Sequence, residues 1–173
     1  METIPTRLVD NHTIIDPVEA LIPGRNTAHD ALRKQFRGLA SEALKNTNED
    51  GLVIILAACL AAGSSRAREH FQEYVELATA RGEPLVVGRV VCDESANKKR
   101  VCSEERKKKG GGGGGGETKL AADKILAEIR KEHTLLEVKS DEWRIFPFKM
   151  DTTNRAVGEA TNRIFEFLPT KHH

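Results

Sequence analysis

Two nearly continuous apolar runs, separated by an amphipathic segment, constrain the fold of this 173-residue chain more than any other feature. They are LVIILAACLA, which starts at Leu52, and PLVVGRVVC, which starts at Pro84. Runs of this kind are typical of strands that are covered on both faces of a parallel sheet. The residues between them, Ala67 to Ala80, have apolar side chains at helical spacing with Phe71, Val75 and Ala78 inward, and Arg81-Gly82 ends the helix. Strand, helix and strand at this spacing predict a βαβ unit.

The flanking segments predict further strands and helices of the same kind. A strand is expected to end near Asp10, and Asn26 or Thr27 is expected to cap a helix with apolar positions Leu32, Phe36, Leu39 and Leu44. Ser95 to Lys109 and Thr118 to His133 also read as helices, and the last helix, Arg155 to Leu168, is expected to be capped by Asp151 to Thr153. We therefore predict one α/β domain over residues 1–173, with three layers and a mostly parallel sheet of about four strands: Arg7–Asp10, Leu52–Cys59, Leu85–Cys92 and Ile145–Met150.

Composition excludes several classes of protein. Lysine and arginine total 27 against 26 acidic residues, so the net charge of +1 gives no signal for nucleic-acid binding. The longest apolar run, Leu52 to Ala62, is about half the roughly 20 residues of a membrane span. With no targeting signal at the N-terminus, these features predict a cytoplasmic protein with no membrane partner. The odd number of widely spaced cysteines predicts buried, reduced thiols, and no metal-ligand spacing is present.

Cationic side chains recur at steps of four from just before Asn26 into the helix that follows it. They are Arg25, His29, Arg33 and Arg37. Residues spaced in this way share one face of a helix, and such a stripe suits an anionic ligand. The alternative interpretation is a solvated helix face.

The seven glycines from Gly110 to Gly116 resemble a phosphate-binding loop only superficially. Residues 111–118 read GGGGGGET, which places Glu117 where the pattern GxxxxGK[ST] requires a lysine. A carboxylate at that position would repel a triphosphate. We interpret residues 107–118 as a flexible Lys/Gly-rich insertion, because glycine has the greatest backbone entropy to lose on ordering.

Several segments together resemble a group of small fungal P-loop kinase-like proteins, which is similar to the shikimate, gluconate and chloramphenicol phosphotransferase kinases. The segments are LVDNHTIIDPVEALIPGR, LVIILAACLA, VVCDESANKKRVCSEER with the following TKL, IRKEHTLLE and MDTTNRAVGEATNRIFEFL. The resemblance covers about Arg7 to Leu168 and implies a P-loop kinase-like fold. It also implies an ancestral ATP-dependent phosphotransfer to a small hydroxylated molecule, with ATP and Mg²⁺ as cofactors.

The resemblance assigns roles to several residues. Asp10 looks like a catalytic base or substrate-orienting carboxylate, and Arg25, Arg33 and Arg37 would bind the acceptor substrate. Arg100 and Arg106 would belong to a lid that closes over phosphates. Asp151, Thr152 and Thr153 would form the loop near the adenine. No metal ligand is assigned.

The sequence also departs from the family pattern, since it starts at the equivalent of the second strand and lacks the first strand, the phosphate loop and the first helix. Because that loop supplies charge neutralisation, efficient catalysis is not expected. Either the two apolar strands pair directly, or the sheet has an unfilled centre that favours homo-oligomers or instability. Two alternatives stay open. One is a non-catalytic interaction or regulatory protein that binds an acidic partner through its basic lid helix, and the other is an incomplete gene model.

Overall fold

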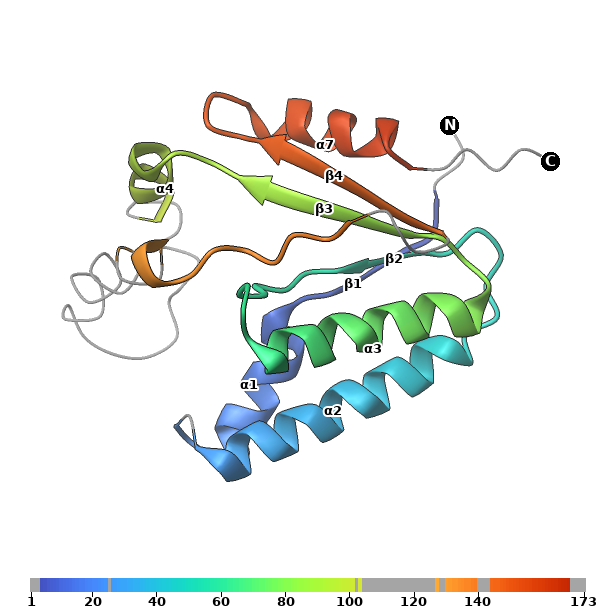
Figure 1. The fold of residues 1–173 in the computed structure, drawn as a ribbon. Coiled ribbons are helices and arrows are strands. Elements are labelled where there is room, and N and C mark those ends of the chain that lie inside the picture. Colours follow the sequence, from blue (N-terminus) through green and yellow to red (C-terminus); the bar gives the residue numbers. More distant parts are fainter. Residues whose placement is uncertain are drawn as a thin grey trace. The chain divides into compact units, whose positions relative to one another are not determined.

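The computed structural model describes residues 4–24, 26–101, 103, 127, 130–139 and 144–168. They group into two compact units: unit 1 comprises Met1–Leu60 and Arg68–Glu83, and unit 2 comprises Ala61–Ala67 and Pro84–His173. The elements are β1 (Thr6–Val9), α1 (Asn11–Leu21), α2 (Thr27–Lys45), β2 (Val53–Leu56), α3 (Ser65–Arg81), β3 (Leu85–Val91), α4 (Glu94–Val101), β4 (Ile145–Asp151) and α7 (Val157–Glu166). The predicted mixed α/β class with parallel strands is confirmed (Figure 1).

Unit 1 is built on two short parallel strands. β1 pairs with β2 in a register that runs from Thr6 opposite Val53 to Val9 opposite Leu56. The helices α1, α2 and α3 lie on one side of this sheet (Figure 1). Val9 and Leu56 point to the same face because side chains alternate along a strand, and both line a pocket on the helix side. Leu8 and Ile55, on the opposite face, are 59% and 47% exposed.

The chain turns from β1 into α1 at Asp10. The Asp10 Oδ1 accepts hydrogen bonds from the backbone N–H of Thr13 at 2.9 Å and from the Thr13 hydroxyl at 2.9 Å. These bonds satisfy N–H and O–H groups at the start of the helix, as expected of an N-cap aspartate. The sequence did not predict this helix, because Pro17 lies inside it and proline usually ends a helix. The buried Ile14 and Val18, four residues apart, fix α1 in the core.

The buried faces of α2 and α3 differ from the predicted ones. Asn26 caps α2 as expected, and Leu44 is buried, but Leu39 is 71% exposed. The buried face of α2 carries His29 and Leu44, with Arg33 and Arg37 half-buried between them. On α3, Phe71, Val75 and Ala78 are only half-buried, whereas His70 and Leu77 are buried. The core of unit 1 therefore contains polar side chains that an apolar pattern cannot reveal.

Unit 2 contains a longer parallel pair. β3 and β4 pair over seven positions, from Leu85 opposite Ile145 to Val91 opposite Asp151. Gly88 lies opposite Phe148, and a Cβ at Gly88 would be 2.6 Å from the tip of the Phe148 ring. That ring stacks on Phe167, just after α7, with 4.3 Å between ring centroids. A side chain at position 88 would therefore require the Phe148 ring to move.

The predicted single sheet differs from the pairing in the described residues, where the strands form two separate two-stranded sheets. An apolar run indicates burial but not which strand lies beside it. The strand predicted over Leu52–Cys59 is limited to Val53–Leu56, and Cys59 is exposed, contrary to the expectation of a buried thiol. The other three strand predictions are confirmed within one residue at each end.

Two helix ends in unit 2 also differ from prediction. Helix α4 ends at Val101, and Ser103 is not helical, although the sequence predicted a helix to Lys109. Helix α7 begins after Ala156, so the predicted cap by Asp151 to Thr153 is wrong. The Asp151 carboxylate instead accepts hydrogen bonds within its own loop, and Glu159 Oε2 accepts from the Ala156 N–H at 3.2 Å. Among the described residues, no helix is long and apolar enough to cross a membrane.

Candidate functional site

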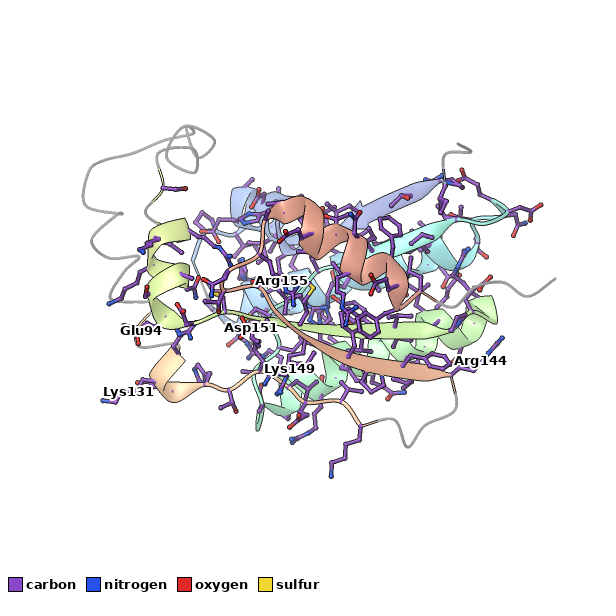
Figure 2. All side chains as sticks on the ribbon, turned by 90° about the horizontal axis from the view of Figure 1, so that it is seen from above. Glu94, Lys131, Arg144, Lys149, Asp151 and Arg155 are labelled. Carbon is purple, nitrogen blue, oxygen red and sulfur yellow. The ribbon has the colours of Figure 1, made fainter. Side chains whose placement is uncertain are left out.

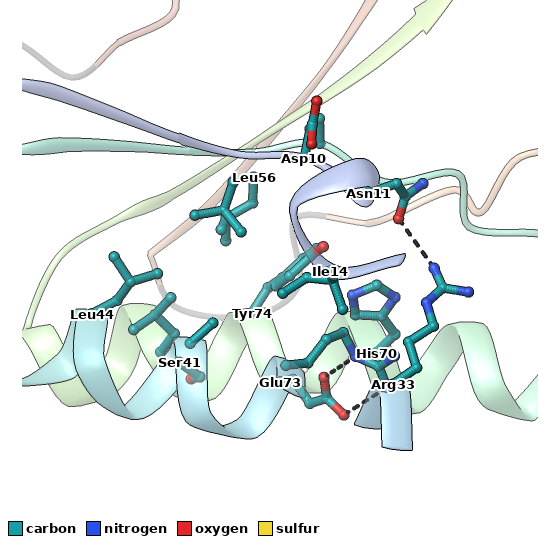
Figure 3. Close-up of a pocket in the computed structure, with 15 residues that line it drawn as sticks. Asp10, Asn11, Ile14, Arg33, Ser41, Leu44, Leu56, His70, Glu73 and Tyr74 are labelled. Carbon is teal, nitrogen blue, oxygen red and sulfur yellow. Dashed lines mark hydrogen bonds and ion pairs between the residues drawn. The ribbon is translucent and has the colours of Figure 1, made fainter. Parts of the chain in front are cut away.

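The candidate site is a small pocket in unit 1, under the carboxyl ends of β1 and β2, which we call the unit-1 pocket (Figure 3). Its free volume is about 40 Å³, enough for a few water molecules at about 10–15 Å³ each. A larger ligand would therefore insert only one end. The polar side chains of the lining are Asp10, Asn11, Arg33, Arg37, Ser41, His70, Glu73 and Tyr74, and the apolar ones include Val9, Ile14, Leu44, Leu56 and Leu77.

A two-point ion pair between α2 and α3 forms part of the wall. Arg37 Nε donates to Glu73 Oε2 at 2.8 Å, and Arg37 Nη2 donates to Glu73 Oε1 at 3.2 Å. The side chains of Arg37 and Glu73 are only 14% and 26% exposed. Such bidentate pairing fixes the guanidinium plane. The positive charge of Arg37 is thus balanced by Glu73 and is not presented to a ligand alone.

Arg33 lies one turn earlier on α2 and reaches toward α1. Its Nη2 donates to Asn11 Oδ1 at 3.2 Å, as Figure 3 shows. Arg33 thereby links α2 to the first turn of α1, and it lines the pocket. A guanidinium in a pocket wall can form charge-assisted hydrogen bonds with an anionic or electron-rich ligand group.

His70 and Tyr74 supply neutral polar groups to the same pocket. The pKa of His70 is lowered to about 4, chiefly by burial; the nearby charges of Arg37 and Arg33 also lower it, whereas Glu73 raises it. Burial also raises the pKa of Tyr74. The two rings are 4.8 Å apart between centroids. Near neutral pH the pocket therefore holds an uncharged imidazole and an uncharged phenol, both able to form hydrogen bonds with a hydroxyl group.

Asp10 stands at the rim of this pocket, at the end of β1. The hydrogen bond from the Thr13 backbone N–H, followed by that from the Thr13 hydroxyl, lowers the pKa of the Asp10 carboxyl. A carboxylate with a lowered pKa is a weaker proton acceptor. Asp10 is therefore better suited to accept a hydrogen bond from a ligand hydroxyl than to remove a proton. Of the two roles predicted for Asp10, catalytic base and substrate-orienting carboxylate, this geometry favours the second.

The structure brings three of the predicted site residues together, since Asp10, Arg33 and Arg37 all line the unit-1 pocket. His29, the other cationic candidate of the stripe, is instead 3% exposed, with Nε2 3.3 Å from Glu19 Oε2 of α1. His29 therefore contributes to the packing of α1 on α2. Arg25 and Arg106, and the insertion predicted over residues 107–118, lie outside the described residues.

The predicted lid and adenine-loop residues meet in unit 2. Arg100 of α4 donates through Nη1 to Thr152 Oγ1 at 3.0 Å and through Nη2 to the carbonyl oxygens of Thr152 and Thr153. Asp151 accepts from the Thr153 hydroxyl and N–H at 2.6 and 2.8 Å, and these bonds lower the pKa of its carboxyl. Figure 2 shows Asp151 at the end of β4. The guanidinium of Arg100 therefore holds the loop that follows β4.

Five polar residues of the pocket were not identified from the sequence: Asn11, Ser41, His70, Glu73 and Tyr74. The last three recur on α3 at spacings of three and four, which is the spacing of one helix face. A polar stripe opposite the cationic stripe of α2 could have indicated that the two helices pair. The apolar residues Phe71 and Val75 gave a stronger signal, and they predicted that a different face of α3 is buried.

ATP and Mg²⁺, which the family resemblance implies, do not fit the described residues. The sequence contains no GxxxxGK[ST] pattern, and the donors of Arg100 are used within unit 2. Within the described part of the chain, no group of three or more His, Cys, Asp and Glu side chains is arranged to hold a metal ion.

Comparison with protein-family models, characterised proteins and solved structures found no match to this chain.

Proposed function

We propose that this chain is a degenerate P-loop kinase-like protein that binds a small hydroxylated molecule in the unit-1 pocket, with weak or no phosphotransfer. The observation that carries the proposal is that Asp10, Arg33 and Arg37, named from sequence as catalytic and acceptor-binding residues, line one pocket. They come from the end of β1 and from the inner face of α2. On this proposal, the parallel strands of both units belong to one three-layer domain of the P-loop kinase type.

The pocket chemistry supports a hydroxylated ligand. A hydroxyl group both donates and accepts hydrogen bonds, and the lining offers acceptors on Asp10 and His70 and donors on Arg33 and Tyr74. Apolar side chains such as Ile14 and Leu44 can contact the carbon atoms of the end that enters the pocket. A few well-placed polar groups on an apolar wall are typical of small-molecule sites.

The described residues supply no step of phosphoryl transfer. Transfer of a phosphoryl group depends on positioning and on neutralising the charge of the phosphates. Arg37 is paired with Glu73, and Arg100 holds the loop that follows β4. We therefore assign this chain binding and orientation of the acceptor molecule, and no proton or phosphoryl transfer is assigned to a residue.

The described part of the basic helix, α4, leaves little charge for the alternative of an acidic partner. In the described helix, Lys98 Nζ lies 3.3 Å from Glu94 Oε1, and Arg100 is used by Thr152 and Thr153. Both charges are thus engaged within unit 2. Lys99, the third basic residue of α4, is exposed, and Arg106 lies outside the described residues.

Replacing Arg33 by alanine is expected to weaken ligand binding by at least about tenfold, because hydrogen bonds to charged groups contribute about 1.5–3 kcal/mol. Isothermal titration of the full chain with shikimate and with gluconate measures the effect. These are the hydroxylated acceptors of the kinases that the sequence resembles.

Lys34→Ala is the matched control. Lys34 is adjacent on α2, is 63% exposed and pairs with the exposed Glu69, so its loss should leave the affinity unchanged. The proposal fails if neither compound binds the wild-type protein, or if a folded Arg33→Ala variant binds as tightly as the wild type.

A further inference from the structure

Two cations lie side by side on the sheet of unit 2. Arg89 of β3 lies directly opposite Lys149 of β4 in the parallel register, and Val87 lies opposite Pro147 one step earlier on the same face. Like charges directly opposite each other on neighbouring strands are destabilising. An anion near both groups would remove this cost.

An exposed counter-ion already lies beside Arg89. Glu137 Oε1 lies 3.3 Å from Arg89 Nη2, and the Glu137 side chain is 70% exposed whereas that of Arg89 is 27% exposed. Asp151, two residues beyond Lys149 on the same face of β4, also faces Lys149, but its carboxylate is held by Thr153. Glu137 can therefore swing into water, while Asp151 is fixed.

A groove with apolar walls adjoins the two cations, and we call it the unit-2 groove. Its volume is about 210 Å³, and its lining residues are Val87, Arg89, Leu136, Glu137, Val138, Pro147, Phe148 and Lys149. The segment that carries Leu136 and Val138 is attached to unit 2 by the Ala61–Leu135 bridge and by the Ala62 N–H, which donates to the Thr134 carbonyl at 2.7 Å. This volume lies below the roughly 300 Å³ at which drug-sized ligand sites begin.

We propose that the unit-2 groove binds a small amphipathic carboxylate, with its anionic head between Arg89 and Lys149 and its apolar tail over Val87 and Pro147. The charge complementarity and the apolar walls both select this class of ligand. The carboxylate takes the place of Glu137 beside Arg89, so two cations share one ligand anion. This site lies within unit 2 and is independent of the proposed function of the unit-1 pocket.

Titration of the ¹⁵N-labelled full chain with hexanoate, followed by amide NMR, tests the proposal. Hexanoate is expected to shift the amide signals of Val87, Arg89, Leu136 and Val138 in a saturable way. Hexanol, which has the same tail without the charge, is expected to bind about tenfold more weakly, since a charge-assisted contact is about twice as strong as a neutral one. Equal binding of hexanol would overturn the proposal, as would saturable shifts confined to other residues or the absence of shifts.

Two substitutions with opposite expected effects sharpen the test. Lys149→Met should weaken hexanoate binding about two- to fivefold, and Glu137→Gln should tighten it by a similar factor, the scale of partly exposed ion pairs. The exposed residues Lys131 and Glu132 supply the controls Lys131→Met and Glu132→Gln, which should leave the affinity unchanged. If Lys149→Met fails to fold, Glu137→Gln decides alone, and unchanged or weaker binding by that variant contradicts the proposed competition for Arg89.

Discussion

Acidification from pH 6.5 to about pH 4 is expected to lower the free energy of unfolding by up to about 3 kcal/mol through His70 alone. Burial holds the pKa of His70 at about 4 in the folded protein, whereas its ordinary value is 6.5. The unfolded chain therefore binds more protons than the folded chain between these values. By linkage, the stability contribution is complete above pH 6.5 and is lost as the pH falls through the folded pKa.

The His70→Phe variant isolates this effect, because phenylalanine keeps an aromatic ring beside Tyr74 and cannot titrate. Urea unfolding followed by far-UV circular dichroism at several pH values gives the free energies. The variant should lose most of the pH dependence in this window. The same substitution at His12, which is 79% exposed and pairs with Asp16, should leave the pH dependence of the wild type in place. If His70→Phe and wild type show equal slopes, His70 is not the buried neutral group described above.

Breaking the Arg37–Glu73 pair is expected to destabilise the protein by about 2–3 kcal/mol for either Arg37→Met or Glu73→Gln. Each change leaves the other charged or polar group half-buried without its bidentate partner. The double variant should recover part of the loss, because it removes both groups together. A double-mutant cycle built from the unfolding free energies measures the coupling between the two side chains.

The same two helices supply a matched control for this cycle. Lys34 Nζ and Glu69 Oε2 also lie 3.3 Å apart between α2 and α3, but both side chains are more than 60% exposed. Exposed pairs contribute about 0–1 kcal/mol. The Lys34–Glu69 cycle should therefore give a coupling energy well below that of Arg37–Glu73. Equal coupling energies in the two cycles would show that the inner pair is as hydrated as the outer one.

The positions of the strands were more predictable than the pairing between them. Apolar runs and turn residues located β1, β3 and β4 within one residue at each end, since these signals are local. The pairing of strands into two sheets depends on contacts between distant residues, which local patterns do not encode. Helix α1 was missed because the signals of Asp10 as an N-cap and of Pro17 as a helix breaker point in opposite directions.

The candidate site was predictable to the extent that cations repeat on one helix. The spacing of Arg33 and Arg37 put them on a common face, and the pocket confirms that they lie together. The direction in which these two side chains point was harder to predict, because a stripe of arginines on a helix usually faces water. Here Glu73 and Asn11 provide partners that allow the stripe to face the interior of unit 1. That partnership arises only when α1, α2 and α3 have packed.

The imidazole of His70 offers the most direct test of the claim that the unit-1 pocket binds a small hydroxylated molecule. Nitrogen-detected NMR of ¹⁵N-histidine-labelled protein, titrated with gluconate and with shikimate, reports on this ring. A ligand hydroxyl in the pocket is expected to shift the His70 ring nitrogens while those of the exposed His12 stay unchanged. Unchanged His70 signals at saturating concentrations of both compounds would contradict the proposed site.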